Sequence, residues 1–205
     1  MLKPVLRGFQ AGVLIALGGS VFLACDSRYA GAVLFSVALF GICMKGYALF
    51  TGQVGYMALD HGKSAWQSLL LGLLGNAAAS CGLGALVRAG LPALGETARA
   101  LCLAKLDQSV FSTGVRAFFC GILMYLAVSI FREKGSALGI LLCVPTFILS
   151  GFEHSIADMF YFGASGIVSL RALGFIWTAI AGNALGGLFL PVLTLLAEKG
   201  ETHEG

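Results

Sequence analysis

Long, mainly apolar segments alternate with short polar turns along most of this chain. Four of them, at residues 8–25, 65–87, 110–131 and 172–197, contain few charged residues. Each is close to the roughly 20 residues that an α-helix needs to cross the hydrocarbon core of a bilayer. The pattern therefore predicts four uninterrupted membrane-spanning helices, with a short surface helix over residues 88–109.

Two more apolar segments, at residues 29–59 and 136–170, are interrupted by polar residues near their middles. In the first, Lys45 is followed by the motif L-F-T-G-Q at residues 49–53. The second carries three ionisable side chains, namely Glu153, His154 and Asp158. A charge at mid-depth in a membrane is expensive unless it faces a cavity or a partner.

Both segments are therefore expected to be helices that break within the membrane, with each break buried in protein and lining a path. A polar loop between two short helices outside the membrane is the alternative for residues 150–160. Together the segments predict an all-α membrane protein with six transmembrane helices, of which the second and fifth are broken. We expect residues 1–205 to form a single transmembrane domain.

The composition supports a chain surrounded by a lipid bilayer. Hydrophobic residues make up 58% of the sequence and charged residues only 11%, whereas a soluble domain carries about 25% charged residues. The net charge of +3 is too small to indicate a nucleic-acid partner. The composition therefore indicates an integral, multi-pass membrane protein.

Neither the cysteines nor the histidines are arranged as metal ligands. The six cysteines are spread singly through apolar segments without a CxxC pair, which is typical of small packing residues. His61, His154 and His203 do not have a metal-binding spacing. We expect no metal and no cofactor.

The two halves of the chain resemble each other. R-G-F-Q-A-G-V-L-I-A-L at residues 7–17 is similar to R-A-F-F-C-G-I-L-M-Y-L at residues 116–126. Asn76 and Asn183 each follow a glycine, and the two interrupted segments occur in the same order. Each half reads as a span, a broken span and a span, so the second half is inverted in the membrane. This predicts inverted three-helix repeats over approximately 1–90 and 110–198, with a permeation site where the breaks meet.

A broken helix leaves backbone N–H groups free at the start of its second half, and such groups attract anions. The sequence has no intramembrane ring of acidic residues that would select cations. The pattern therefore favours a path for a small monovalent anion or its conjugate acid. At its centre we place His154, whose side chain titrates closest to neutrality, and the hydroxyl of Thr51 from the opposing break. Both residues have a simpler alternative as helix caps or packing residues.

Two further groups of side chains lie close to the breaks. Asn76 and Asn183 are expected to brace the freed backbone by side-chain hydrogen bonds, or else to join helices without touching substrate. Four apolar residues are candidates for constrictions that strip water from a solute, although packing is the default for each: Phe35, Leu39, Phe50 and Phe147.

These residues resemble a known family. G-F-E-H-S-I-A-D-M-F at residues 151–160 closely resembles the signature G-F-E-H-S-[IV]-A-N-M-[YF] of the formate–nitrite transporter family. L-F-T-G at residues 49–52, L-A-V at residues 126–128 and G-N-A-L-G-G at residues 182–187 are similar to its motifs on the second, fourth and sixth helices. The likeness covers nearly the whole chain.

The resemblance implies an aquaporin-like protomer in a homopentamer, in which each protomer has its own pore. It implies that the loops carrying Thr51 and His154 face each other, with apolar slits above and below. The slit residues matched by motif are Phe35, Leu39, Phe50 and Phe147. Lys105 matches the vestibule lysine that would draw anions into the pore.

The chain departs from the family pattern at several positions. Asp158 replaces the asparagine of the histidine motif, and Gly121 replaces an asparagine on the fourth helix. Lys45 adds a positive charge close to the first break. We expect Lys45 and Asp158 to form a pair that balances the charge of the pore.

The function expected from these features is passive or proton-coupled passage of small monovalent anions across the inner membrane of the cell. Formate is the leading candidate, and nitrite, hydrosulfide and related weak-acid anions are the others. A neutral-solute or gas channel of the same shape is the alternative. An enzyme that uses Glu153, His154 and Asp158 as acid–base groups is not expected, because the sequence offers neither a nucleophile nor a metal partner.

Overall fold

The computed structural model describes residues 2–201, in which every regular element is helical. The predicted charged end of the chain beyond residue 201, including His203, lies outside the described residues. The elements are α1 (Leu2–Ala24), α2 (Arg28–Lys45), α3 (Phe50–Gln53), the 3₁₀ helix η1 (Val54–Ala58), α4 (Lys63–Gly90), α5 (Pro92–Leu106), α6 (Val110–Lys134), α7 (Leu138–Leu149), α8 (Ser155–Ser165) and α9 (Leu170–Glu201). The all-helical prediction is confirmed for this part of the chain.

Five of these helices, α1, α2, α4, α6 and α9, are long and apolar enough to cross a membrane. The chain is therefore a multi-pass membrane protein. The predicted fifth span is divided between α7 and α8, which have 12 and 11 residues and are separately too short to cross. The predicted surface helix over residues 88–109 contains α5, whereas residues 88–90 belong to the end of α4.

A glycine with positive φ ends the helix before each break. Gly46 follows α2 with a φ of 65°, and its N–H group bonds to the carbonyls of Ile42 and Cys43. Gly151 follows α7 with a φ of 68°. Glycine adopts this left-handed conformation without steric penalty, and it ends helices for that reason. Extended backbone follows, at Leu49 before α3 and at His154 before α8.

The long helices pack in pairs, α1 along α4 and α6 along α9, through positions that only glycine can occupy. A Cβ atom added to Gly8 would lie 2.1 Å from the carbonyl oxygen of Gly72, and one added to Gly186 would lie 1.9 Å from that of Phe118. Small residues let helix backbones approach closely, which is how helices associate in lipid. Gly121 belongs to the same contact, because its added Cβ would lie 2.3 Å from the carbonyl oxygen of Asn183.

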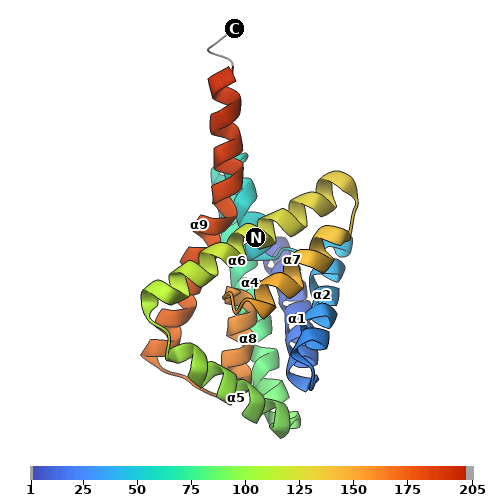
Figure 1. Cartoon of the computed structure of the whole chain (residues 1–205), viewed down its shortest axis with the longest axis vertical. Coiled ribbons are helices and arrows are strands. Elements are labelled where there is room, and N and C mark those ends of the chain that lie inside the picture. Colours follow the sequence, from blue (N-terminus) through green and yellow to red (C-terminus); the bar gives the residue numbers. More distant parts are fainter. Residues whose placement is uncertain (1, 202–205) are drawn as a thin grey trace.

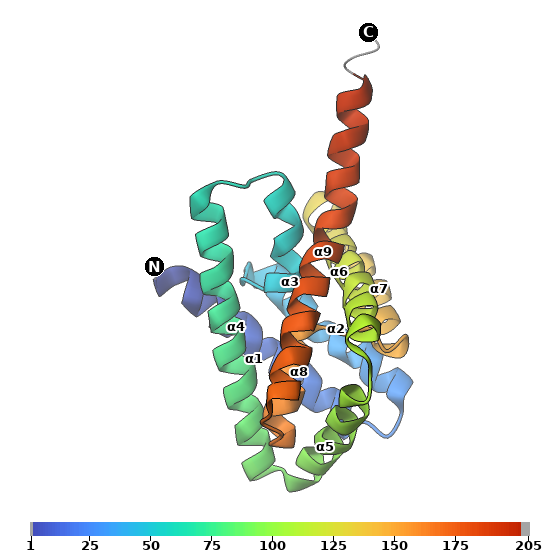
Figure 2. The same cartoon turned by 90° about the vertical axis from the view of Figure 1, so that its left-hand side faces the viewer.

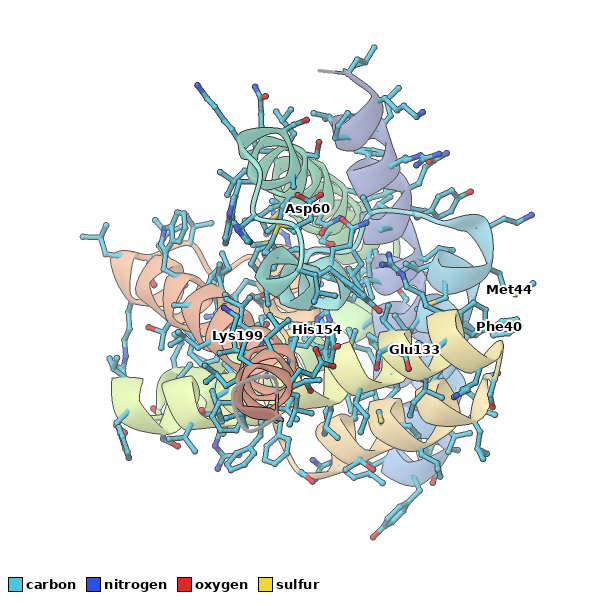
Figure 3. All side chains as sticks on the ribbon, turned by 90° about the horizontal axis from the view of Figure 1, so that it is seen from above. Phe40, Met44, Asp60, Glu133, His154 and Lys199 are labelled. Atoms are coloured by element: carbon cyan, nitrogen blue, oxygen red, sulfur yellow. The ribbon has the colours of Figure 1, made fainter. Side chains whose placement is uncertain are left out.

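The short helix α8 lies inside the bundle, and every residue from 155 to 162 is buried. In the side views, α5 lies across one end of the molecule and the C-terminal part of α9 extends beyond the other helices at the opposite end (Figures 1 and 2). Seen from above, His154 lies near the centre of the bundle, whereas Phe40 and Met44 lie at its edge (Figure 3). The second break is therefore enclosed by helices.

Replacing Gly186 with alanine should destabilise the protein, because the new methyl group would push α9 away from Phe118 on α6. We expect a loss of about 1–3 kcal/mol, typical of overpacking, measured as a lower melting temperature in detergent. Gly174→Ala on the same helix is the matched control, since nothing lies within 4 Å of its added Cβ. Equal melting temperatures for the two variants would contradict close packing of α6 and α9.

Candidate functional site

The two breaks meet through one hydrogen bond between side chains. Thr51 Oγ1 on α3 lies 2.8 Å from Nε2 of His154, the residue that immediately precedes α8. The two side chains are almost completely buried, with exposed fractions of 0% and 2%. The structure thus brings together two residues about a hundred positions apart in the sequence.

His154 also caps α8. Its Nδ1 atom accepts a hydrogen bond from the backbone N–H of Ala157 at 3.2 Å. A neutral imidazole has one donor and one acceptor nitrogen, so in this arrangement the proton resides on Nε2 and is donated to Thr51. The sequence offered capping and a position opposite Thr51 as alternatives for His154. In the structure the same imidazole ring does both, through Nδ1 and Nε2 respectively.

Two buried asparagines hold the backbone at the breaks in the same way. Asn76 Oδ1 accepts from the N–H of Phe50 at 2.9 Å, and its Nδ2 donates to the carbonyls of Gly8 and Ala48. Asn183 Oδ1 accepts from the N–H of Ser155 at 2.9 Å. Its Nδ2 donates at 2.8 Å to two carbonyls, those of Ala117 and Glu153. Each amide joins a break to the long helices beside it.

These bonds correct one expectation. The first N–H groups of the second half-helices, at Phe50 and Ser155, are not free to bind anions, because the two asparagine side chains occupy them. Inside a membrane an unpaired backbone group is costly, and a buried amide satisfies it permanently. The expectation of free N–H groups at the breaks is therefore wrong for Phe50 and Ser155.

Two cavities lie at opposite ends of the helices that line them. The first, of about 430 Å³, is lined by Phe35 of α2, Arg116 of α6 and His154, among others. The second cavity, of about 200 Å³, is lined by residues nearer the C-terminal ends of α2 and α6, beginning with Leu39 and Val128 respectively. Leu49 and Gly52, on either side of Thr51 in the sequence, also line it. The Thr51–His154 pair therefore lies between two cavities.

A charged cluster forms one wall of the first cavity. Lys105 at the end of α5 binds the carboxylates of both Glu153 and Asp158, with its Nζ atom 3.0 Å from Asp158 Oδ1. Gln108 Nε2 donates to Glu153 Oε1 at 2.8 Å. The predicted pair between Lys45 and Asp158 is wrong, because Lys45 lies exposed at the end of α2, where Gly46 terminates the helix.

The four constriction candidates occupy different places. Phe35 and Phe147 line the first cavity, where their rings meet edge to face with centroids 6.3 Å apart. Phe147 also stacks on the His154 ring, with centroids 5.5 Å apart. Leu39, one turn after Phe35, lines the second cavity. Phe50 is buried but lines neither cavity, since it lies in the apolar core.

Sequence reasoning missed several residues that shape the first cavity. Gln108 orients Glu153, and Tyr161 lines the wall beside the cluster. Arg116 donates to the carbonyl of Gly151 at 2.9 Å, and Arg28 donates to that of Ile148 at 3.0 Å. No local motif marks these residues, because each acts across the fold. Among residues 2–201, no cluster of three or more His, Cys, Asp and Glu side chains is placed to hold a metal.

Comparison with known proteins identifies the family. The sequence profile of the formate/nitrite transporters matches residues 1–197. The chain belongs to the formate/nitrite transporter family. This confirms the resemblance drawn from the motifs.

Relatives in the family include transporters of known and unknown substrate. The chain is 29% identical over 192 residues to the uncharacterized transporter YwcJ of Bacillus subtilis, a match covering 82% of this chain and 75% of YwcJ. It is 30% identical over 176 residues to the nitrite transporter NirC of Salmonella typhimurium, covering 75% and 65%. The aligned part thus spans slightly less than two thirds of NirC.

Solved structures share the fold. An FNT family ion channel superposes with a TM-score of 0.83 at 25% identity, covering 96% of this chain and 90% of that chain. A pentameric formate channel with formate bound superposes with a TM-score of 0.78 at 23% identity, covering 96% and 97%. These relatives are transporters and channels rather than enzymes.

Asn183→Ala should lower the melting temperature in detergent, because it leaves the N–H of Ser155 and the carbonyl of Glu153 without this partner. Each unsatisfied buried group costs about 1–3 kcal/mol. Thr178→Ala on the same helix is the control, since that hydroxyl bonds only to the carbonyl of Gly174 one turn earlier. If Asn183→Ala melts like the control, the amide does not hold the break.

Proposed function

We propose that this protein transports small monovalent anions, with formate first and nitrite or hydrosulfide next, through a pore between the two breaks. Passage is passive or coupled to protons. The observation that carries the proposal is the buried Thr51–His154 hydrogen bond, which lies between two cavities at opposite ends of α2 and α6. The names of the relatives, a nitrite transporter and a formate channel, point to the same substrates.

The architecture proposed with this function has six transmembrane helices in a single domain. The second is α2 followed by α3 and η1, and the fifth is α7 followed by α8. The equivalent hydrogen bonds of Asn76 and Asn183 support inverted repeats over approximately 1–90 and 110–198 in an aquaporin-like protomer. A homopentamer in the inner cell membrane is proposed by analogy with the pentameric formate channel.

Transport begins in the first cavity. Lys105, Arg28 and Arg116 are the positively charged residues that line it, and they raise the local concentration of anions. Beyond them, Phe35 and Phe147 offer no polar group to replace the water of a naked charge. An anion that takes up a proton from cavity water would pass this apolar section as its neutral conjugate acid. It would lose the proton again in the second cavity, where Arg132 lines the wall.

His154 serves this path as a hydrogen-bond donor. Its Nε2–H points at Thr51 and, when the Thr51 bond opens, at a solute in the same position. A doubly protonated ring would lose the bond in which Nδ1 accepts from Ala157. The ring therefore hydrogen-bonds the permeating species, and any proton that it gives from Nε2 must be regained from water or from the solute.

Formate flux into proteoliposomes should rise as the pH falls, and His154→Phe should reduce it by about tenfold or more, the effect of losing one buried hydrogen bond in the path. Stopped-flow measurement of internal acidification reports the flux. His61→Ala is the control, because His61 is exposed at the turn before α4.

Flux that is indifferent to pH and unchanged in His154→Phe would remove the role of His154. Glycerol or water flux without any formate movement would instead favour a channel for neutral solutes. The same assay with nitrite, hydrosulfide, acetate and lactate ranks the substrates.

A further inference from the structure

Asp158 adds a carboxylate to the cavity wall at a position where the family motif has asparagine. Lys105 is the only residue in the described part of the chain that forms an ion pair with either Asp158 or Glu153. When both carboxylates are ionised, the three side chains carry one net negative charge. That charge borders the cavity through which an anion enters.

One oxygen of Asp158 has no partner. Oδ1 binds Lys105, whereas Oδ2 is buried without any hydrogen bond, in a side chain that is only 1% exposed. Buried polar atoms almost always have a partner, so an exception needs an explanation. A proton bound at Oδ2, or a donor arriving from the cavity, would satisfy this atom. Because Asp158 lines the first cavity, such a proton or donor can exchange with cavity water.

Two further positive charges, Arg28 and Arg116, line the same cavity without an ion pair to either carboxylate. The guanidinium groups of Arg28 and Arg116 bond to backbone carbonyls of the segment 148–151. The remaining titratable groups that face the cluster or its cavity are Cys102 on α5, Cys120 on α6, and His154 and Tyr161 at the break and on α8. None of these supplies a fixed positive charge.

We infer that Lys105, Glu153 and Asp158 form a proton-operated electrostatic gate at the first cavity. Asp158 takes one proton at Oδ2 from cavity water and returns it there. With the proton bound, the cluster is neutral and the guanidinium groups of Arg28 and Arg116 attract the anion. Without it, the net negative charge of the cluster offsets part of that attraction and slows entry. Asp158 thereby adds a pH dependence that a chain with asparagine at this position lacks. The inference rests on the proposed anion transport.

Asp158→Asn keeps the shape of the side chain and leaves Lys105 and Glu153 as a single ion pair. Its formate flux should equal that of the natural protein at about pH 5.5 and exceed it by about tenfold at about pH 8.5, since one charge this close to the path shifts the local potential. His154 is unchanged in this comparison. Asp107→Asn is the matched control, because that carboxylate is exposed, two residues from Lys105, and does not line the cavity.

Identical pH profiles for Asp158→Asn and the natural protein would overturn the gate. Lower flux for Asp158→Asn at both pH values would also overturn it, because Asp158 would then be a proton donor in the path. The double variant Lys105→Met with Asp158→Asn restores one negative charge through Glu153, and it should lose the gain at high pH. Retention of the gain would show that shape rather than charge matters.

Proton binding has a readout that does not need transport. Infrared difference spectra between the two pH values should show a protonated carboxyl band that disappears as the pH rises and is absent from Asp158→Asn. If this band is present but the natural protein moves no formate at either pH, the proposed function fails and the gate fails with it. If formate moves and the band is missing, only the gate fails.

Discussion

Two buried asparagine amides make the interrupted helices possible. In lipid, backbone groups that leave a helix find no water, so each one needs a partner within the protein. Asn76 and Asn183 each offer one acceptor and two donors, and each uses all three on the break and on a neighbouring long helix. The side chains of Thr51 and His154 meet at the centre, beside the backbone that these two amides hold in place.

The polar groups of the site fall into three separate sets. Asparagine amides bond the backbone at the breaks, the centre holds the Thr51–His154 pair, and a charged cluster lies at the first cavity around Lys105. The aromatic rings of Phe35 and Phe147 line the same cavity, and Phe147 stacks on His154.

The three residues that depart from the family pattern affect different properties of the structure. Gly121 belongs to the packing of α6 on α9, where any larger side chain would meet the backbone of Asn183. Asp158 changes the charge of the cavity wall instead, and its partner is Lys105. Lys45 takes part in neither, because the turn at Gly46 leaves it exposed at the end of α2.

Local properties of the sequence were enough to predict the helices, the two interruptions and the family, because apolar length, glycine positions and a histidine motif are read from neighbouring residues. The bracing of the breaks by Asn76 and Asn183 was also among the expectations. The pairing of Lys105 with Asp158 and the support of Glu153 by Gln108 were not predictable in this way. Each depends on residues far apart in the chain whose distance is set by helix packing. The apolar pattern determines which segments become membrane helices. The way these helices pack against one another determines which charged side chains form ion pairs.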